Sequence, residues 1–154
     1  MSDYSHEWFC EQIVDNTGDA IVLGDVEGKV QLWNAGAERI FGFRADEVVG
    51  KSMDFIIPEG LRERHREGYG EAMKTGHTRY SRDLLAVPAI RKDGKRISIE
   101  FTIVLVRGND GRLLGPAAIL RDVTSRWNQD KELRKRLADL EAEISRLTVG
   151  KRVS

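Results

Sequence analysis

Alternation of apolar and polar residues marks several stretches of this chain as strands with one buried face. The clearest stretch lies between 96 and 106, where every second residue is a large apolar one. Its expected inward positions are Ile97, Ile99, Phe101, Ile103 and Leu105. Less regular apolar runs predict further strands over 20–23, 29–34, 78–91 and 113–123.

Short turn sequences separate these strands and predict how they pair. Lys92-Asp93-Gly94 and Asn109-Asp110-Gly111 join the last three strands, and residues 25–28 join the first two. Such tight turns connect neighbouring antiparallel strands. Pro88 cannot donate to a strand ladder, so we expect it at a bulge or on an edge strand. The pattern predicts an α+β fold, a five-stranded antiparallel sheet covered on one face by short helices.

Helical segments precede the sheet and fill the gap between its two groups of strands. Short helices are expected over 5–16, 35–41 and 45–49. A longer helix, 59–74, has a stripe of residues at spacings of three and four. The stripe consists of Leu61, His65, Tyr69, Ala72 and Met73. We expect it to cover the apolar face of the sheet and to enclose a pocket or a packed core.

The C-terminal stretch 126–147 is a predicted helix with a heptad pattern. Its apolar residues recur at alternating intervals of four and three, as in a coiled coil. These residues, called the seam below, are Leu133, Leu137, Leu140, Ile144 and Leu147. A seam on a helix that has left its domain needs a partner, so we expect a homodimer. The other interpretation is that this helix folds back on its own domain.

Composition argues against several classes of function. The 25 basic and 25 acidic residues cancel, which disfavours direct nucleic-acid binding. Cys10 is the only cysteine, so we expect neither a disulfide framework nor a multi-cysteine metal centre. No apolar run is long enough for a bilayer, and the N-terminus lacks signal-peptide features, so we expect a cytoplasmic protein without membrane contact. No phosphate loop and no hydrolase motif occurs in the sequence, so we do not expect an enzyme.

Four motifs, in this order, resemble those of the PAS sensory domains. WNAGAERIFG at 33–42 is similar to the family's W-N-x-A-x-E-x-(I/L)-F-G segment, and EVVGK at 47–51 to its E-(V/I)-x-G-(K/R) step. RKDG at 91–94 and RDVT at 121–124 are similar to the K-D-G turn and the terminal R-D-(I/V)-T. Asn34 stands between a strand and a helix, where its side chain can cap the helix. The resemblance covers residues 9–124.

The resemblance implies a sensory domain followed by a signalling helix. The corresponding organisation is an N-terminal helix at 1–19, a PAS domain at 20–124, a coiled-coil helix at 125–148 and a tail at 149–154. In this family the junction that carries Asp122 and Thr124 passes changes in the sheet to the next helix. The simpler role of these two residues is to end the strand. A downstream signalling protein is the implied partner, in phosphorelay or transcriptional regulation.

Part of the resemblance is to the haem-PAS domains of FixL-type oxygen sensors. His65 matches their axial haem ligand in its spacing from the K-D-G turn, and a neutral imidazole can bind iron. The resemblance thus implies haem b, with His65 as its metal ligand and Arg79 and Arg82 near its propionates. Leu85 stands where those sensors have an oxygen-binding arginine. The expected pocket residues are His65, Tyr69, Leu85, Phe101, Ile103 and Leu120.

Three hypotheses about function remain open at this point. The preferred one is a module that senses a small ligand or a redox state in this pocket and transmits through a dimeric helix. The alternatives are a ligand-free dimerisation and protein-interaction module and a haem-based gas sensor. A large cavity over His65 would favour haem, and side chains packed across that space would favour the ligand-free module. We expect Trp8, Trp33 and Trp127 in surface or interface packing rather than around a ligand.

Overall fold

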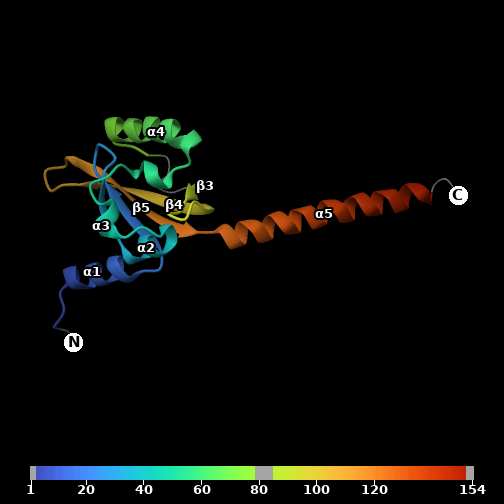
Figure 1. The fold of residues 1–154 in the computed structure, drawn as a ribbon, viewed down its shortest axis with the longest axis horizontal. Coiled ribbons are helices and arrows are strands. Elements are labelled where there is room, and N and C mark those ends of the chain that lie inside the picture. The colour runs from blue at the N-terminus through green and yellow to red at the C-terminus, as the bar shows by residue number, and fades with distance from the viewer. Residues whose placement is uncertain (1–2, 79–84, 152–154) are drawn as a thin grey trace. The chain divides into compact units, whose positions relative to one another are not determined.

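The computed structural model describes residues 3–78 and 85–151. The chain separates into two compact units, Met1–Asp122 and Val123–Ser154. The first unit combines a twisted sheet with several helices, and the second is one long helix (Figure 1). Arg79 and Arg82, the expected propionate partners, lie outside the described residues, as does the side chain of Leu85.

Five strands of the described chain form a single antiparallel sheet, as the alternation predicts. They are β1 (Ala20–Gly24), β2 (Val30–Trp33), β3 (Leu85–Ile90), β4 (Arg96–Arg107) and β5 (Leu113–Asp122). Their order across the sheet is β2-β1-β5-β4-β3. Because β3 is therefore at an edge, Pro88 is accommodated without breaking a central ladder. The predicted beginning of that strand at 78 runs into residues 79–84, outside the described chain.

The strand register places the core on one face of the sheet. Phe101 lies opposite Leu120, and Leu120 lies opposite Ala20 on the next strand, so all three share a face. Ile97 and Ile99 of β4 are 7% and 4% exposed on that same face, which confirms the predicted inward positions at this end of the strand. Ile103 and Leu105, further along, are half-buried.

The short helices that follow β2 and precede β3 in the chain cover this face of the sheet. They are α2 (Ala35–Phe41), α3 (Ala45–Val48), and the 3-10 turns η1 (Met53–Ile56) and η2 (Glu59–Leu61), while α1 (His6–Asn16) precedes β1. Phe41 and Val48 enter the core. Gly42 ends α2 in a left-handed conformation, φ 80°, that favours glycine. The predicted short helices are thus present, and the backbone N–H of Lys92 in the K-D-G turn donates to the Phe41 carbonyl at 2.8 Å.

The side chain of Asn34, which lies between β2 and α2, hydrogen-bonds to four segments of the chain. Its Oδ1 accepts from the backbone N–H of Ile21 at 2.8 Å and of Ala37 at 2.9 Å, the second being the predicted helix cap. Its Nδ2 donates to the carbonyls of Val14 at 2.7 Å and Asp19 at 3.1 Å. The side chain is 4% exposed. One amide therefore satisfies backbone groups from α1, the following turn, β1 and α2.

Trp33 belongs to the core, so the expectation of surface packing was wrong for this residue. Its side chain is 5% exposed, and its ring lies 5.4 Å from that of Phe41 and 5.6 Å from that of Phe55, between centroids. The indole Nε1 donates to the carbonyl of Phe43 at 2.9 Å. A buried tryptophan needs such an acceptor for its one donor. Trp8 and Trp127 are exposed, at 38% and 50%.

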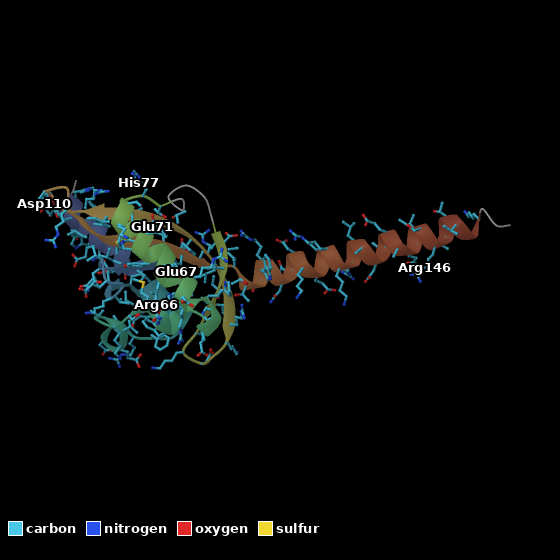
Figure 2. All side chains as sticks on the ribbon, turned by 90° about the horizontal axis from the view of Figure 1, so that it is seen from above. Arg66, Glu67, Glu71, His77, Asp110 and Arg146 are labelled. Atoms are coloured by element: carbon cyan, nitrogen blue, oxygen red, sulfur yellow. The ribbon has the colours of Figure 1, made fainter. Side chains whose placement is uncertain are left out.

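Helix α4 (Arg62–Thr75) belongs to the first unit and lies above the sheet in the view of Figure 1. It begins later than predicted because residues 59–61 form the 3-10 turn η2. The predicted stripe is its less exposed side, but none of its residues is fully buried. The acidic side chains Glu67 and Glu71 lie on its exposed side (Figure 2).

The second unit consists of helix α5 (Thr124–Gly150), which extends the predicted 126–147 at both ends. Each seam residue is more than half exposed, from Leu140 at 56% to Leu147 at 64%. Across the described residues, no helix combines the length and the apolar character that a membrane span requires.

Candidate functional site

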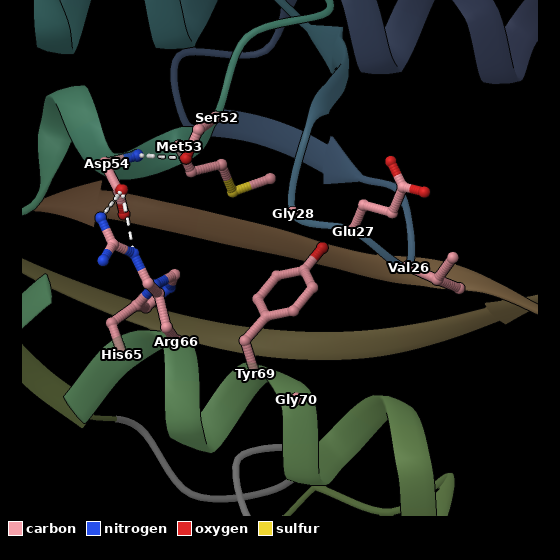
Figure 3. Close-up of a pocket in the computed structure, with 10 residues that line it drawn as sticks. All are labelled: Val26, Glu27, Gly28, Ser52, Met53, Asp54, His65, Arg66, Tyr69 and Gly70. Atoms are coloured by element: carbon pink, nitrogen blue, oxygen red, sulfur yellow. Dashed lines mark hydrogen bonds and ion pairs between the residues drawn. The ribbon is translucent and has the colours of Figure 1, made fainter. Parts of the chain in front are cut away.

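A small cleft opens between α4 and the turn that joins β1 to β2 (Figure 3). Its volume is about 190 Å³. Three segments line it: residues 26–28 of the turn, residues 52–54 at the start of η1, and His65, Arg66, Tyr69 and Gly70 of α4. The lining combines apolar groups with one phenol, one imidazole and charges of both signs, so the cleft suits a small polar molecule.

Tyr69 reaches across the cleft from α4 to the β1–β2 turn (Figure 3). Its hydroxyl donates to the backbone carbonyl of Asp25. Burial raises the pKa of Tyr69, so the hydroxyl keeps its proton and remains a donor. Gly24 makes this approach possible, because a Cβ at that position would collide with the Tyr69 hydroxyl and with the end of Met53.

An ion pair joins α4 to η1 at the other end of the cleft. The Arg66 guanidinium binds the Asp54 carboxylate, with Nε 3.1 Å from Oδ2. This hydrogen bond lowers the pKa of Asp54, so the pair is charged at neutral pH. Arg62 adds a third link, from its Nε to the Ile57 carbonyl at 3.1 Å. These three contacts, made by Arg62, Arg66 and Tyr69, are called the α4 tethers below.

His65 lies between these tethers, half-buried on the inner side of α4. Burial lowers its pKa, which the charge of Asp54 partly opposes, so the imidazole is neutral at pH 7. Its ring centroid is 5.8 Å from that of Tyr69. A neutral imidazole can accept a hydrogen bond or bind a metal through its free nitrogen. Within the described chain, however, no cluster of three or more metal-binding side chains occurs.

The structure brings some of the expected pocket residues together and leaves others apart. His65 and Tyr69 share the cleft, whereas Phe101, Ile103 and Leu120 are not among its lining residues. Leu120 is buried at 5% exposure in the core, and Phe101 packs against that core. The backbone of Leu85 pairs with Phe101 at the start of β3.

Sequence reasoning missed the other lining residues of the cleft. Asp54 and Arg66 stand 12 positions apart, and Tyr69 is 44 positions from the carbonyl that it binds. The one local signal was Gly24 at the end of a strand, where a missing side chain can indicate close approach.

A haem does not fit among the side chains that the structure describes around this cleft. The cleft, about 190 Å³, is below the roughly 300–1,000 Å³ that is usual for drug-sized ligands, so it has room only for a molecule much smaller than haem. Two of the residues expected to line a haem pocket belong instead to the packed interior, because Leu120 lies in the hydrophobic core and Phe101 packs against it. A group of that size would need α4 to move away from the sheet.

Comparisons with known proteins agree on one family. A model described as PAS domain matches residues 18–125. The oxygen sensor protein DosP of Escherichia coli is 25% identical over 127 residues, which are 82% of this chain and 16% of that protein. The sensor protein FixL of Bradyrhizobium diazoefficiens is 26% identical over 141 residues, 91% of this chain and 26% of that protein.

Solved structures agree with this match. The structure of an RNA-binding light-oxygen-voltage receptor superposes with a TM-score of 0.70 and 26% identity, over 90% of this chain and 38% of that one. The chain spans about a quarter or less of the two curated relatives.

Proposed function

Because the chain belongs to the PAS domain family, we propose that it senses a small polar ligand in the cleft beside α4 and responds through a dimer of α5. The relatives DosP and FixL are sensor proteins. In this proposal the N-terminal helix occupies 1–19, the sensory domain 20–124, the coiled-coil helix 125–148 and the tail 149–154. The partner that receives the signal is a downstream signalling protein.

The weak and mainly polar attachment of α4 to the rest of the first unit is the observation that supports the proposal. No residue of this helix is fully buried, and its links to the turn and to η1 are polar. The Arg66–Asp54 pair is partly exposed, and such pairs contribute only about 0–1 kcal/mol. A ligand that competes for these polar groups can therefore shift α4 at small cost. Such a shift is the two-state element that sensing requires.

The proposed signal passes from the sheet to the C-terminal helix along the chain itself. β5 ends at Asp122, and α5 begins at Thr124. A change in the sheet has to pass through this short junction to reach the seam. Pairing of two seams would cover five exposed aliphatic residues on each helix.

Haem remains the second candidate because His65 offers a neutral imidazole in the cleft. The small volume of the cleft disfavours haem, because haem would fit only after α4 has moved. The absorption spectrum of protein purified after growth with haem precursor separates the two candidates. We expect no Soret band. A band that His65→Ala abolishes would replace the small-ligand proposal with a haem sensor.

Native mass spectrometry after gentle purification from cell extract tests the small-ligand proposal. Gly70 lines the cleft, whereas Gly68 does not, and a side chain has open space at both positions. We expect a bound small molecule on the parent and on Gly68→Phe, and weaker retention in Gly70→Phe, which adds a bulky side chain at a lining position of the cleft. Equal retention in both variants would place the ligand elsewhere. No bound molecule in the parent would favour the ligand-free module.

A further inference from the structure

We infer that the cleft beside α4 takes a small organic cation with N–H donors, such as an alkylguanidinium, which replaces Arg66 at the carboxylate of Asp54. The inference rests on the proposed function and adds the charge of its ligand. Both side chains of the Arg66–Asp54 pair line the cleft, and the pair joins α4 to η1. A ligand that opens this pair has to take the place of one partner, either the cation or the anion.

The two partners of the pair differ in exposure, which decides which of them a ligand can replace. The side chain of Arg66 is 64% exposed, whereas that of Asp54 is 23% exposed. A displaced Arg66 can turn into water and keep its charge solvated. If an anion took its cation instead, Asp54 would stay in a largely covered position without a partner, which is unfavourable. The exchange therefore favours a ligand that stands in for the guanidinium.

The other charges around the cleft point to the same sign of ligand. Glu27, Asp54 and Arg66 are the charged lining residues beside the neutral His65, so the lining has one negative charge in excess. Lys29 pairs with Glu27 at 3.0 Å, but both side chains are more than half exposed, so this pair is weak. An anionic ligand would meet two carboxylates, whereas a cation is attracted by both.

Arg62 is the other cation whose charge acts on Asp54. Its Nε is engaged with the carbonyl of Ile57 at 3.1 Å. Taking over the Asp54 carboxylate would therefore cost Arg62 its own link to the chain. When Arg66 leaves, the carboxylate is accordingly open to a ligand that brings its own N–H donors.

Tyr69 provides a flat surface for the cation. Figure 3 shows its ring between Asp54 on one side and Glu27 on the other. The hydroxyl is held by the carbonyl of Asp25, which keeps the ring across the cleft. The face of an aromatic ring attracts a cation, and a planar guanidinium can stack on it. A ligand bound to Asp54 can therefore contact the Tyr69 ring at the same time.

An NMR titration of the whole chain with three small molecules of similar shape tests the inference. The probes are ethylguanidinium, the neutral N-ethylurea and the anionic propionate, each at constant ionic strength. We expect ethylguanidinium to shift the backbone signals of 52–54 and 65–70 and to move the Arg66 Nε–H signal toward that of free arginine. Its affinity should exceed that of either other probe at least about tenfold, because it alone offers charged donors to Asp54.

Two variants should change the affinity for ethylguanidinium in opposite directions. Asp54→Asn removes the charge that holds the cation and should weaken binding at least about tenfold. Arg66→Gln removes the competing guanidinium and should strengthen binding. Glu67→Gln and Arg64→Gln make the same changes of charge at exposed positions of α4 and are the matched controls. Both controls should leave the affinity nearly unchanged.

Several results would overturn the inference. Tighter binding of propionate, with the two variants changing in the reverse directions, would show that the ligand is an anion. Equal binding of N-ethylurea and ethylguanidinium would show that charge plays no part. The absence of any saturable shift of the cleft signals with millimolar ethylguanidinium would overturn it as well, and this comparison needs no variant.

The inference and the proposed function can fail separately. A neutral or anionic molecule recovered on the protein by native mass spectrometry would overturn the inference while the small-ligand proposal stands. Binding of ethylguanidinium in the cleft without any change in the dimer dissociation constant would uphold the inference, whereas the proposed response through α5 would fail.

Discussion

Asn34→Asp is expected to lower the free energy of unfolding of the first unit by about 3–5 kcal/mol. The substitution keeps the shape of the side chain but replaces the Nδ2 donor by an acceptor. The carbonyls of Val14 and Asp19 then lose their partner and face a carboxylate at a site that is 4% exposed. Urea unfolding followed by tryptophan fluorescence measures the change.

Two control variants distinguish the loss of the Asn34 hydrogen bonds from a general effect of the added negative charge. Asn109→Asp places the same substitution in an exposed turn and should change stability by no more than about 0.5 kcal/mol. Asn34→Ala, which removes all four hydrogen bonds without adding a charge, should also destabilise the fold. An Asn34→Asp protein as stable as the parent would show that these contacts contribute little.

Leu137→Asp is expected to raise the dissociation constant of the dimer at least about 100-fold, because two leucine side chains lose burial at about 1.5–3 kcal/mol each. The new carboxylates would also face each other in a central layer of the seam. Sedimentation equilibrium measures the constant. The variant should fold as the parent does, since Leu137 is 59% exposed in the single chain.

Ala142→Asp is the matched control for this variant, because it adds the same charge to the side of α5 opposite the seam. It should leave the dissociation constant nearly unchanged. A Leu137→Asp protein that stays dimeric would contradict pairing through the seam. Equal weakening by both variants would indicate a general effect of charge on the helix.

The sheet could be predicted from sequence because its signals are local. The alternation in 96–106 sets the faces of β4, and the Asp-Gly turns set its antiparallel neighbours. The four motifs together identified the family, which the match over residues 18–125 confirms. Asn34 was predicted as a cap, although not as the centre of a wider network, since its contacts with Val14 and Asp19 depend on how α1 and the turn fold around it.

The cleft could not be predicted because side chains from distant positions form it. The stripe of α4 correctly indicated which side of the helix faces inward, but not that it stays half-buried. Tyr69 meets the β1–β2 turn only because Gly24 leaves space. Trp33 was misplaced for a similar reason, since Phe41 and Phe55, which enclose it, come from α2 and η1.

The central claim is that the attachment of α4 influences the dimerisation of α5. It is tested most directly by measuring the dimer dissociation constant of a variant in which the α4 tethers are removed. Asp54→Ala with Tyr69→Phe removes two of the three tethers and leaves the seam intact. Glu67→Gln with Glu71→Gln changes the exposed side of the same helix and serves as the control. Coupling predicts a change of about fivefold or more in the tether variant, within the range of allosteric effects, and none in the control. Equal constants in parent and tether variant would contradict the account and would favour a ligand-free dimerisation module.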